Sequence, residues 1–239
     1  MAKLNQLGIK VFSDGADFDS MMAMAANPLI KGFTTNPTLM RKAGIADYEA
    51  FARKILAAIP DRPISLEVFA DDAPEMERQA RRIASWGANV NVKIPVTNTK
   101  REFMGPLIAR LSASGIAVNV TAVMTLDQVR GIADALDPGT PAIVSVFAGR
   151  IADTGIDPVP HMTDALALLC ALPKAELLWA SPRELLNIFQ ADAIGCHIIT
   201  VTPDTLAKLS LVDKDLDAYS LETVEMFYKD ARAAGFSIA

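Results

Sequence analysis

The sequence predicts a closed (β/α)8 barrel, or TIM barrel, that forms a single domain over residues 1–239 and ends in an extra helix. Apolar runs with the two-residue period of strands alternate eight times with longer amphipathic runs. The length of 239 residues is one at which such barrels commonly form one domain. Hydrophobic residues make up 51% of the chain and charged residues 21%, which fits a globular protein with a large interior.

The expected strands are the short apolar runs, and the expected helices fill most of the gaps between them. The strands cover residues 9–14, 32–35, 64–69, 89–95, 116–122, 141–147, 175–180 and 196–201. The clearest helical patterns cover residues 73–86, 101–114, 125–136, 158–172 and 182–192, with a last helix at 216–234. Regular alternation indicates a parallel sheet. A doubly wound open sheet is the competing architecture, but the turn after the first strand, Asp14-Gly15-Ala16-Asp17, lacks its glycine-rich phosphate loop.

Composition limits the partners and cofactors. The net charge is −5 and there is no long basic run, so nucleic acid and acidic membrane surfaces are not expected partners. No segment has the length of a transmembrane helix and no signal peptide is evident, so we expect a cytoplasmic protein. The two cysteines form no CxxC pair, and no carboxylate-rich or histidine metal motif occurs, so we expect neither a disulfide framework nor a metal site.

Lys93 is the most informative residue, because it interrupts an apolar strand. In Val90-Asn91-Val92-Lys93-Ile94-Pro95-Val96, the apolar residues alternate with Asn91 and Lys93. Both faces of a parallel strand are normally covered, and burial disfavours the charged form of a lysine. A neutral lysine amine can attack a carbonyl and form a Schiff base. The alternative is an edge strand that leaves Lys93 in water.

Polar residues also fall at the carboxyl ends of the other expected strands, where barrels of this type hold their active sites. Some have simple structural explanations: Asp14 is a candidate helix N-cap, Asn36-Pro37 a helix start, and Glu67 a candidate ion-pair partner of Lys93. The strand-end candidates are Asp14, Asn36, Glu67, Lys93, Asn119, Thr121, Ser145, Phe147, Arg150, Ser181 and Arg183.

The segment after the seventh strand has the pattern of an anion site. Ser181-Pro182-Arg183-Glu184 matches a capping box, which predicts a helix N-terminus whose free N–H groups favour anions. Phosphate sites in these barrels commonly lie near strands seven and eight. Arg183 there, and Arg150 after the sixth strand, are candidates for holding a phosphate; the alternative is that both are solvent-exposed surface arginines.

These segments resemble the transaldolase family, especially its short branch, which includes fructose-6-phosphate aldolase-like proteins. The matching segments span nearly the whole barrel. They are Lys31-Gly32-Phe33-Thr34-Thr35-Asn36-Pro37-Thr38-Leu39, Val92-Lys93-Ile94-Pro95, Asn119-Val120-Thr121, Ser145-Val146-Phe147-Ala148-Gly149-Arg150 and Ala180-Ser181-Pro182-Arg183. The resemblance implies a cofactor-free enzyme of carbohydrate metabolism, in the pentose phosphate pathway, that transfers a dihydroxyacetone unit between sugar phosphates. It also implies a homo-oligomer, a pentamer or decamer, and the 216–234 helix is a candidate contact.

The resemblance assigns roles position by position. Lys93 is similar to the Schiff-base nucleophile, Asp14 to the acid/base, and Glu67 with Thr121 to the pair that orders a catalytic water. The remaining positions resemble groups that hold the substrate: Asn36, Asn119 and Ser145 at the dihydroxyacetone portion, and Arg150, Ser181 and Arg183 at the phosphate.

Two positions favour transaldolase over its aldolase relatives, which typically have glutamine and tyrosine where this chain has Glu67 and Phe147. Gly15, Val146 and the segment Val123-Met124-Thr125 depart from the family pattern but leave the catalytic set intact. A fructose-6-phosphate aldolase-like lyase and a non-catalytic phosphosugar-binding barrel are the alternatives.

Overall fold

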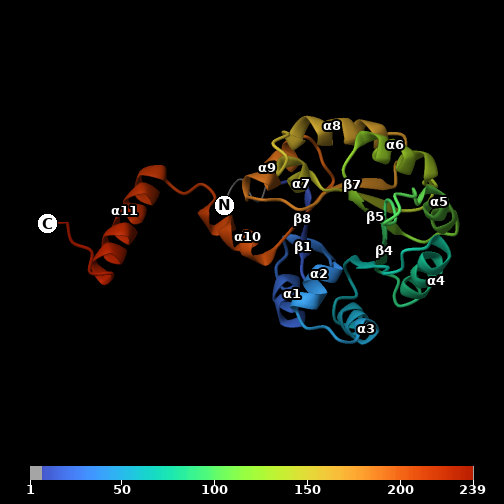
Figure 1. The fold of residues 1–239 in the computed structure, drawn as a ribbon, viewed down its shortest axis with the longest axis horizontal. Helices are drawn as coiled ribbons and strands as arrows, with labels where there is room; N and C mark the ends of the chain where they lie inside the picture. The colour runs from blue at the N-terminus through green and yellow to red at the C-terminus, as the bar shows by residue number, and fades with distance from the viewer. Residues whose placement is uncertain (1–6, 239) are drawn as a thin grey trace.

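The computed structural model describes residues 7–238, and its eight parallel strands close into a barrel in chain order, as predicted (Figure 1). The strands are β1 (Lys10–Asp14), β2 (Ile30–Thr34), β3 (Ile64–Glu67), β4 (Val90–Pro95), β5 (Val118–Val123), β6 (Ala142–Val146), β7 (Ala175–Trp179) and β8 (Ile198–Val201). Each strand pairs in parallel with its two sequence neighbours, and β1 closes the barrel against β8. No helix within the described residues is long and apolar enough to cross a membrane.

The helices lie around the barrel in Figure 1, except for the last. They are α1 (Phe18–Ala25), α2 (Pro37–Lys42), α3 (Tyr48–Ala58), α4 (Ala73–Ala84), α5 (Gly105–Ala113), α6 (Leu126–Ala135), α7 (Ala148–Ala152), α8 (Pro158–Leu169), α9 (Leu186–Ala193), α10 (Pro203–Ala207), the short 3-10 helix η2 (Lys208–Leu211) and α11 (Leu216–Ala233). Two connections, β2 to β3 and β6 to β7, carry two helices each, which the sequence periodicity did not separate.

Helix α9 begins later than predicted. Its first helical residue is Leu186, whereas the capping-box pattern placed the start just after Ser181. Ser181 instead has a positive φ of 57°, and the Asn187 side chain accepts hydrogen bonds from the backbone N–H groups of Arg183 and Glu184. The predicted cap is therefore wrong, because the Asn187 side chain, and not Ser181, accepts the hydrogen bonds from the N–H groups ahead of the helix.

Side chains fill the barrel interior in an apolar and a polar layer. Phe12, Ile143, Leu178 and Ile198 form a small apolar cluster inside the barrel. Gly32, which pairs with Phe12 in the sheet, makes room for it, because a Cβ there would lie 2.5 Å from the Phe12 ring. A much larger apolar core lies between the strands and the surrounding helices.

The polar layer links three strands through buried hydrogen bonds. Asn119 Nδ2 donates to Ser65 Oγ at 3.0 Å, and Ser145 Oγ donates to Asn119 Oδ1 at 2.6 Å. All three side chains are buried, so these bonds remove the cost of placing unpaired polar groups in the interior. The network fixes the barrel wall next to the cavity described below.

Candidate active site

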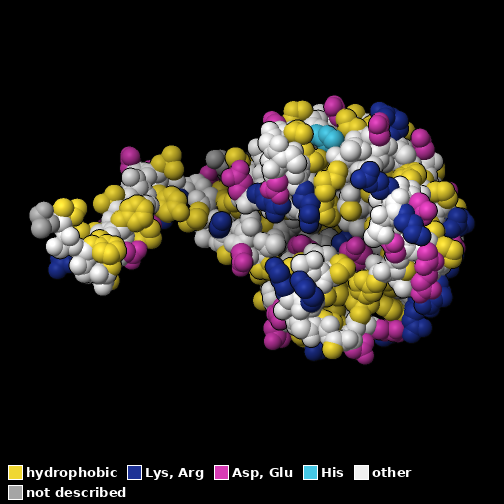
Figure 2. Space-filling view, in the orientation of Figure 1, with side chains coloured by type: hydrophobic (Ala, Val, Ile, Leu, Met, Phe, Trp, Pro, Cys, Tyr) yellow, Lys and Arg dark blue, Asp and Glu magenta, His cyan; other side chains and the backbone are white. Residues whose placement is uncertain are grey.

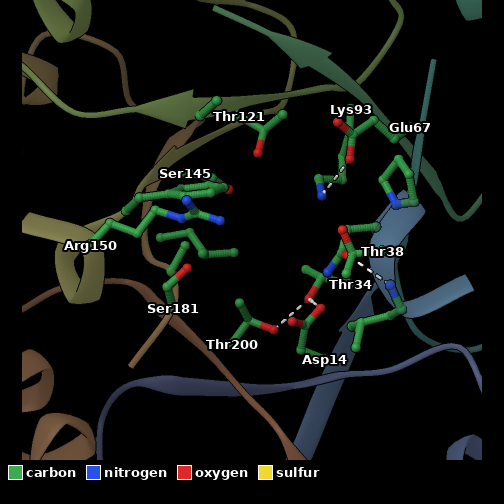
Figure 3. A pocket seen from close by; sticks show the side chains of 17 residues that line it. Asp14, Thr34, Thr38, Glu67, Lys93, Thr121, Ser145, Arg150, Ser181 and Thr200 are labelled. Atoms are coloured by element: carbon green, nitrogen blue, oxygen red, sulfur yellow. Dashed lines mark hydrogen bonds and ion pairs between the residues drawn. The ribbon is translucent and has the colours of Figure 1, made fainter. Parts of the chain in front are cut away.

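A cavity of about 390 Å³ opens at the carboxyl ends of the strands (Figure 3). Its lining combines residues from all eight βα units. Asn119, on β5, is not among them, because it lies buried in the polar layer. Figure 3 shows Arg150, Ser145 and Ser181 on one side of the cavity and Lys93, Glu67 and Asp14 on the other. The lining residues are Asp14, Thr34, Asn36, Pro37, Thr38, Leu39, Glu67, Lys93, Thr121, Ala122, Ser145, Phe147, Arg150, Leu178, Ala180, Ser181 and Thr200.

Lys93 and Glu67 lie side by side on adjacent strands of the barrel. They are paired in the β3–β4 register, and Lys93 Nζ lies 3.0 Å from Glu67 Oε2. The amine also donates a 2.8 Å hydrogen bond to the backbone carbonyl of Thr35. Lys93 is only 6% exposed, so the edge-strand alternative is wrong. The amine and the carboxylate therefore form an ion pair at the cavity.

Asp14 ends β1 and faces the same cavity. Burial raises the pKa of its carboxyl group, and the negative charge of Glu67 adds to this rise. The hydrogen bond from Thr34 Oγ1, at 2.8 Å, and the charge of Lys93 oppose it. Asp14 is not a helix cap, since Asp17 caps α1 instead. A carboxyl group with a raised pKa can exchange a proton with a substrate hydroxyl near neutral pH.

Asn36 serves the fold and the cavity at once. Its side chain caps α2 by accepting a 3.0 Å hydrogen bond from the N–H of Leu39, and Pro37 follows at the first helical position. The same residue lines the cavity. The structural explanation of Asn36-Pro37 is thus confirmed, and it leaves the Asn36 amide beside the space for a ligand.

The end of β5 carries a local irregularity next to Thr121. The β5–β6 register shifts between Val120 and Val123, and Ala122 has a positive φ of 61°. A non-glycine residue in this conformation is uncommon and stores strain. The irregularity lets two successive residues, Thr121 and Ala122, both line the cavity, which a regular strand would not allow.

The opposite side of the cavity is built around Arg150. Its guanidinium lies over the Phe147 ring, 5.6 Å from the ring centre, and both residues line the cavity. Gly149 allows this arrangement, because its backbone N–H donates a 3.2 Å hydrogen bond to the carbonyl of Ala180 and its Cα packs directly on Ser181. The loop after β6 and the loop after β7 are thereby held together, with Arg150 and Ser181 side by side at the cavity.

We expect Gly149→Ala to disrupt this contact. The added Cβ would lie 1.5 Å from the Ser181 carbonyl oxygen, so the backbone of one loop must move. Overpacking of this kind typically costs about 1–3 kcal/mol of folding free energy. Thermal unfolding should show the loss. Gly15→Ala is the matched control, because its Cβ would meet nothing within 4 Å, and equal effects of both substitutions would contradict this explanation.

Arg183 lies elsewhere in the structure. It forms an ion pair with Asp153, in which both side chains are 51% exposed, and it does not line the cavity. Asn119 also does not line it: the amide is fully buried and bonded to Ser65 and Ser145. The other predicted site residues all meet at the cavity.

Sequence reasoning missed Thr200, which lines the cavity from β8. Its signal was present, because Thr200 is a lone polar residue near the carboxyl end of the apolar strand Ile198-Ile199-Thr200-Val201. Thr34 lies in one of the matching segments, and its hydroxyl contacts Asp14. Within residues 7–238, no three His, Cys, Asp or Glu side chains are grouped so that they could hold a metal ion.

The sequence of this chain is similar to those of known proteins of one enzyme family. Residues 11–238 match the family model described as transaldolase/fructose-6-phosphate aldolase. A probable transaldolase of Dehalococcoides mccartyi is 34% identical over 202 residues, which cover 84% of this chain and 90% of the relative. A probable transaldolase of Thermoanaerobacter sp. is 33% identical over 231 residues, covering 96% of this chain and 100% of the relative.

Among solved structures, the chain resembles 2,3-dimethylmalate lyase, with a TM-score of 0.57 and 14% identity over 98% of this chain and 86% of the other. At that identity the likeness shows the barrel fold alone. The family model and the relatives carry the assignment: this chain belongs to the transaldolase/fructose-6-phosphate aldolase family.

Proposed function

We propose that this protein is a transaldolase, which transfers a dihydroxyacetone unit from a ketose phosphate to an aldose phosphate through a Schiff base on Lys93. The donor is sedoheptulose 7-phosphate or fructose 6-phosphate. The observation that carries the proposal is the buried Lys93 amine, paired with Glu67 at 3.0 Å and opening onto the same cavity as Asp14 and Arg150. A purely binding protein has little reason to bury this combination of charges.

The proposed reaction begins at Lys93. A water held by Glu67 and Thr121 carries the Lys93 proton to Glu67, and the neutral amine attacks the ketone carbon C2. Glu67 returns its proton to the hydroxyl of this adduct, which leaves as water and gives an iminium ion. Asp14 then takes the proton of the C4 hydroxyl, the C3–C4 bond breaks, and its electron pair moves to the iminium nitrogen to leave an enamine. The first aldehyde phosphate departs.

The second half reverses these steps with a new aldehyde. The enamine carbon attacks the carbonyl of the acceptor, Asp14 returns the proton to the new alkoxide, and water releases the product from Lys93. No electrons are gained or lost overall, so the cycle needs no redox cofactor. Covalent capture divides one difficult exchange into two easier steps.

Substrate binding uses both sides of the cavity. Asn36 and Ser145 hold the dihydroxyacetone portion, and Arg150 with Ser181 binds the phosphate. We include Asn119 as the group that fixes the Ser145 hydroxyl through its 2.6 Å hydrogen bond. Arg183 leaves Asp153 and binds the phosphate when the substrate enters. This exchange costs little, because an exposed ion pair contributes only about 0–1 kcal/mol to stability.

The acceptor requirement tests this function. Fructose 6-phosphate is incubated with the protein, with and without erythrose 4-phosphate, and the products are measured. A transaldolase forms sedoheptulose 7-phosphate and glyceraldehyde 3-phosphate only when the acceptor is present. Free dihydroxyacetone that accumulates without acceptor would instead identify the lyase alternative, and no product from either donor would favour a non-catalytic phosphosugar-binding barrel.

Phe147→Tyr should move the enzyme toward the lyase. A phenol at this cavity position can help water protonate the enamine, whereas the Phe147 ring gives no such proton path. We expect release of free dihydroxyacetone from fructose 6-phosphate to rise at least about tenfold. An enzymatic dihydroxyacetone assay measures this, with Phe236→Tyr, on the exposed C-terminal tail, as control. Unchanged release would contradict the role given to Phe147.

The proposal includes a homo-oligomer, a pentamer or decamer, in which α11 contacts a second copy. Helix α11 stands away from the barrel (Figure 1), and none of its 18 residues is buried. Apolar side chains gather along α11 in the view of Figure 2, and its exposed large apolar residues include Leu216, Leu221, Val224, Phe227 and Tyr228. Helices with such a face normally bury it against another element.

We further propose a single-domain, cytoplasmic enzyme, since its proposed substrates are phosphorylated sugars.

Phe227→Glu should reduce the size of the assembly. Phe227 is 62% exposed on the apolar face of α11, so the substitution places a charge in the proposed interface and leaves the barrel core untouched. Light scattering should give a mass of several chains for the original protein and a smaller mass for the variant. Ala218→Glu adds the same charge on the face shared with Glu222 and Glu225 and should change nothing. A monomeric original protein would contradict the assembly.

A further inference from the structure

Three polar side chains form a hydrogen-bonded row beside the cavity. Thr34 Oγ1, on β2, lies 2.8 Å from Asp14 Oδ1, on β1, and 2.5 Å from Thr200 Oγ1, on β8 (Figure 3). These strands are adjacent because β1 closes the barrel between β2 and β8. Both threonines are at least nine-tenths buried, with exposures of 3% and 6%, and both line the cavity.

The donor directions in this row follow from the number of hydrogens. A threonine hydroxyl has one hydrogen to donate and can accept through its oxygen. Ionised Asp14 can only accept, so the Thr34 hydrogen goes to Asp14 Oδ1. The hydrogen between the two hydroxyls must then come from Thr200. By donating to Thr34, Thr200 fixes the orientation of the Thr34 hydroxyl and strengthens the hydrogen bond that Thr34 donates to the carboxylate.

The row can also hold Asp14 in both of its charge states. When Asp14 takes the substrate proton on its other oxygen, Oδ2, its Oδ1 can still accept the hydrogen bond from Thr34. Neither the heavy atoms nor the donor directions in the row have to change. The carboxyl group thus keeps one orientation in both protonation states, which a general acid/base needs in order to take and return a proton at the same place.

The fold alone does not require a hydroxyl at position 200. Valine has nearly the same shape as threonine and is at least as good a strand former, and the Thr200 neighbours Ile199 and Val201 are fully buried apolar residues. Among the described residues, Thr34 is the only side chain that donates a hydrogen bond to Asp14. The hydroxyl of Thr200 is therefore best explained by its effect on Thr34 and Asp14.

We propose that Thr200 is a positioning residue for carbon–carbon bond cleavage, which acts through Thr34 to orient Asp14 and to stabilise its ionised form. The inference rests on the proposed function, in which Asp14 moves the substrate hydroxyl proton. Thr200 itself does not exchange a proton with the substrate. Its removal should therefore slow cleavage and leave Schiff-base formation at Lys93 intact.

The direction of the pH effect follows from the groups around Asp14. Lys93 on β4 favours the ionised carboxylate, Glu67 on β3 disfavours it, and Arg150 faces it across the cavity. The hydrogen bond from Thr34 also favours ionisation. Weakening that bond raises the pKa of Asp14. Cleavage needs the ionised form of Asp14, so the pH below which the cleavage rate falls should move upward.

Thr200→Val tests the inference, with Thr200→Ser as the variant that restores the hydroxyl. Two readouts are measured for each: the Lys93 adduct trapped by borohydride with dihydroxyacetone, and the pH profile of fructose 6-phosphate cleavage. For the valine variant we expect unchanged trapping, kcat lowered about tenfold with KM within about twofold, and an acidic limb shifted upward by about one pH unit. The serine variant should return both kcat and the limb toward those of the original protein.

Three results would overturn the inference. The first is a Thr200→Val variant with the original kcat and pH profile, and the second is a Thr200→Ser variant as impaired as Thr200→Val. The third is a Thr34→Val/Thr200→Val double variant that is slower than Thr34→Val by the same factor by which Thr200→Val slows the original protein, since Thr200 is inferred to act only through Thr34. If Thr200→Val fails to fold, Thr200→Ala gives the same comparison with less strain. Absence of a Lys93 adduct in the original protein would refute the proposed function itself, which keeps the two failures distinct.

Discussion

Lys93→Ala should abolish turnover while the barrel stays folded. The side chain supplies the only buried amine at the cavity within the described residues, and without it no iminium can form to accept the electrons of the broken bond. We expect kcat/KM to fall by at least about 10³-fold, which is a modest part of the acceleration that enzymes achieve. A coupled assay with fructose 6-phosphate and erythrose 4-phosphate measures the loss, and circular dichroism checks the fold.

The substitution also leaves Glu67 without its partner. The Glu67 side chain is 18% exposed and sits at the cavity, where water can reach it, so the fold should tolerate the change. Lys10→Ala is a matched control, because Lys10 pairs with Glu176 at 2.7 Å but begins β1 at the other end of the barrel. The control should keep full activity. Substantial turnover by Lys93→Ala would remove Lys93 from the mechanism.

Asp14→Asn should stop the reaction one step later. The amide is nearly the same size as the carboxyl group but cannot take the C4 hydroxyl proton, so the Schiff base should form while the C3–C4 bond stays intact. General acid/base catalysis typically contributes about 10²–10⁴-fold, and we expect a loss of kcat in that range. Borohydride should then trap the whole six-carbon sugar phosphate on Lys93 instead of the three-carbon fragment, and intact-protein mass spectrometry distinguishes the two.

Asp17→Asn is the control for this experiment. Asp17 caps α1 through a 2.8 Å hydrogen bond from the N–H of Ser20, and asparagine is an equally good cap. This variant should trap the three-carbon fragment and keep its activity. A three-carbon adduct on Asp14→Asn at the original rate would show that another group takes the hydroxyl proton.

The barrel and the centre of the site could be predicted from local patterns. Strand periodicity located all eight strands, and polar residues at strand ends pointed to the cavity, because parallel strands of a barrel end on the same face. Lys93 and Glu67 stood out since a charge inside an apolar strand needs a partner, and the register pairs them.

Other features depend on contacts between distant segments, which periodicity does not reveal. Gly149 approaches Ser181 across two loops, and the start of α9 is set by the Asn187 side chain and not by the pattern at Ser181. Asn119 has the sequence signature of a cavity residue, but its partners Ser65 and Ser145 bury it. Thr200 is an ordinary strand residue by itself, and only closure of β8 on β1 brings it to Thr34 and Asp14.

The central claim is that Lys93 forms the Schiff base. The most direct test is to mix the protein with fructose 6-phosphate and borohydride, measure the intact mass, and map the modified peptide. We predict one three-carbon adduct per chain, on Lys93, and none on Lys93→Ala. An adduct on a different lysine, or no adduct with either fructose 6-phosphate or sedoheptulose 7-phosphate, would contradict the proposed mechanism.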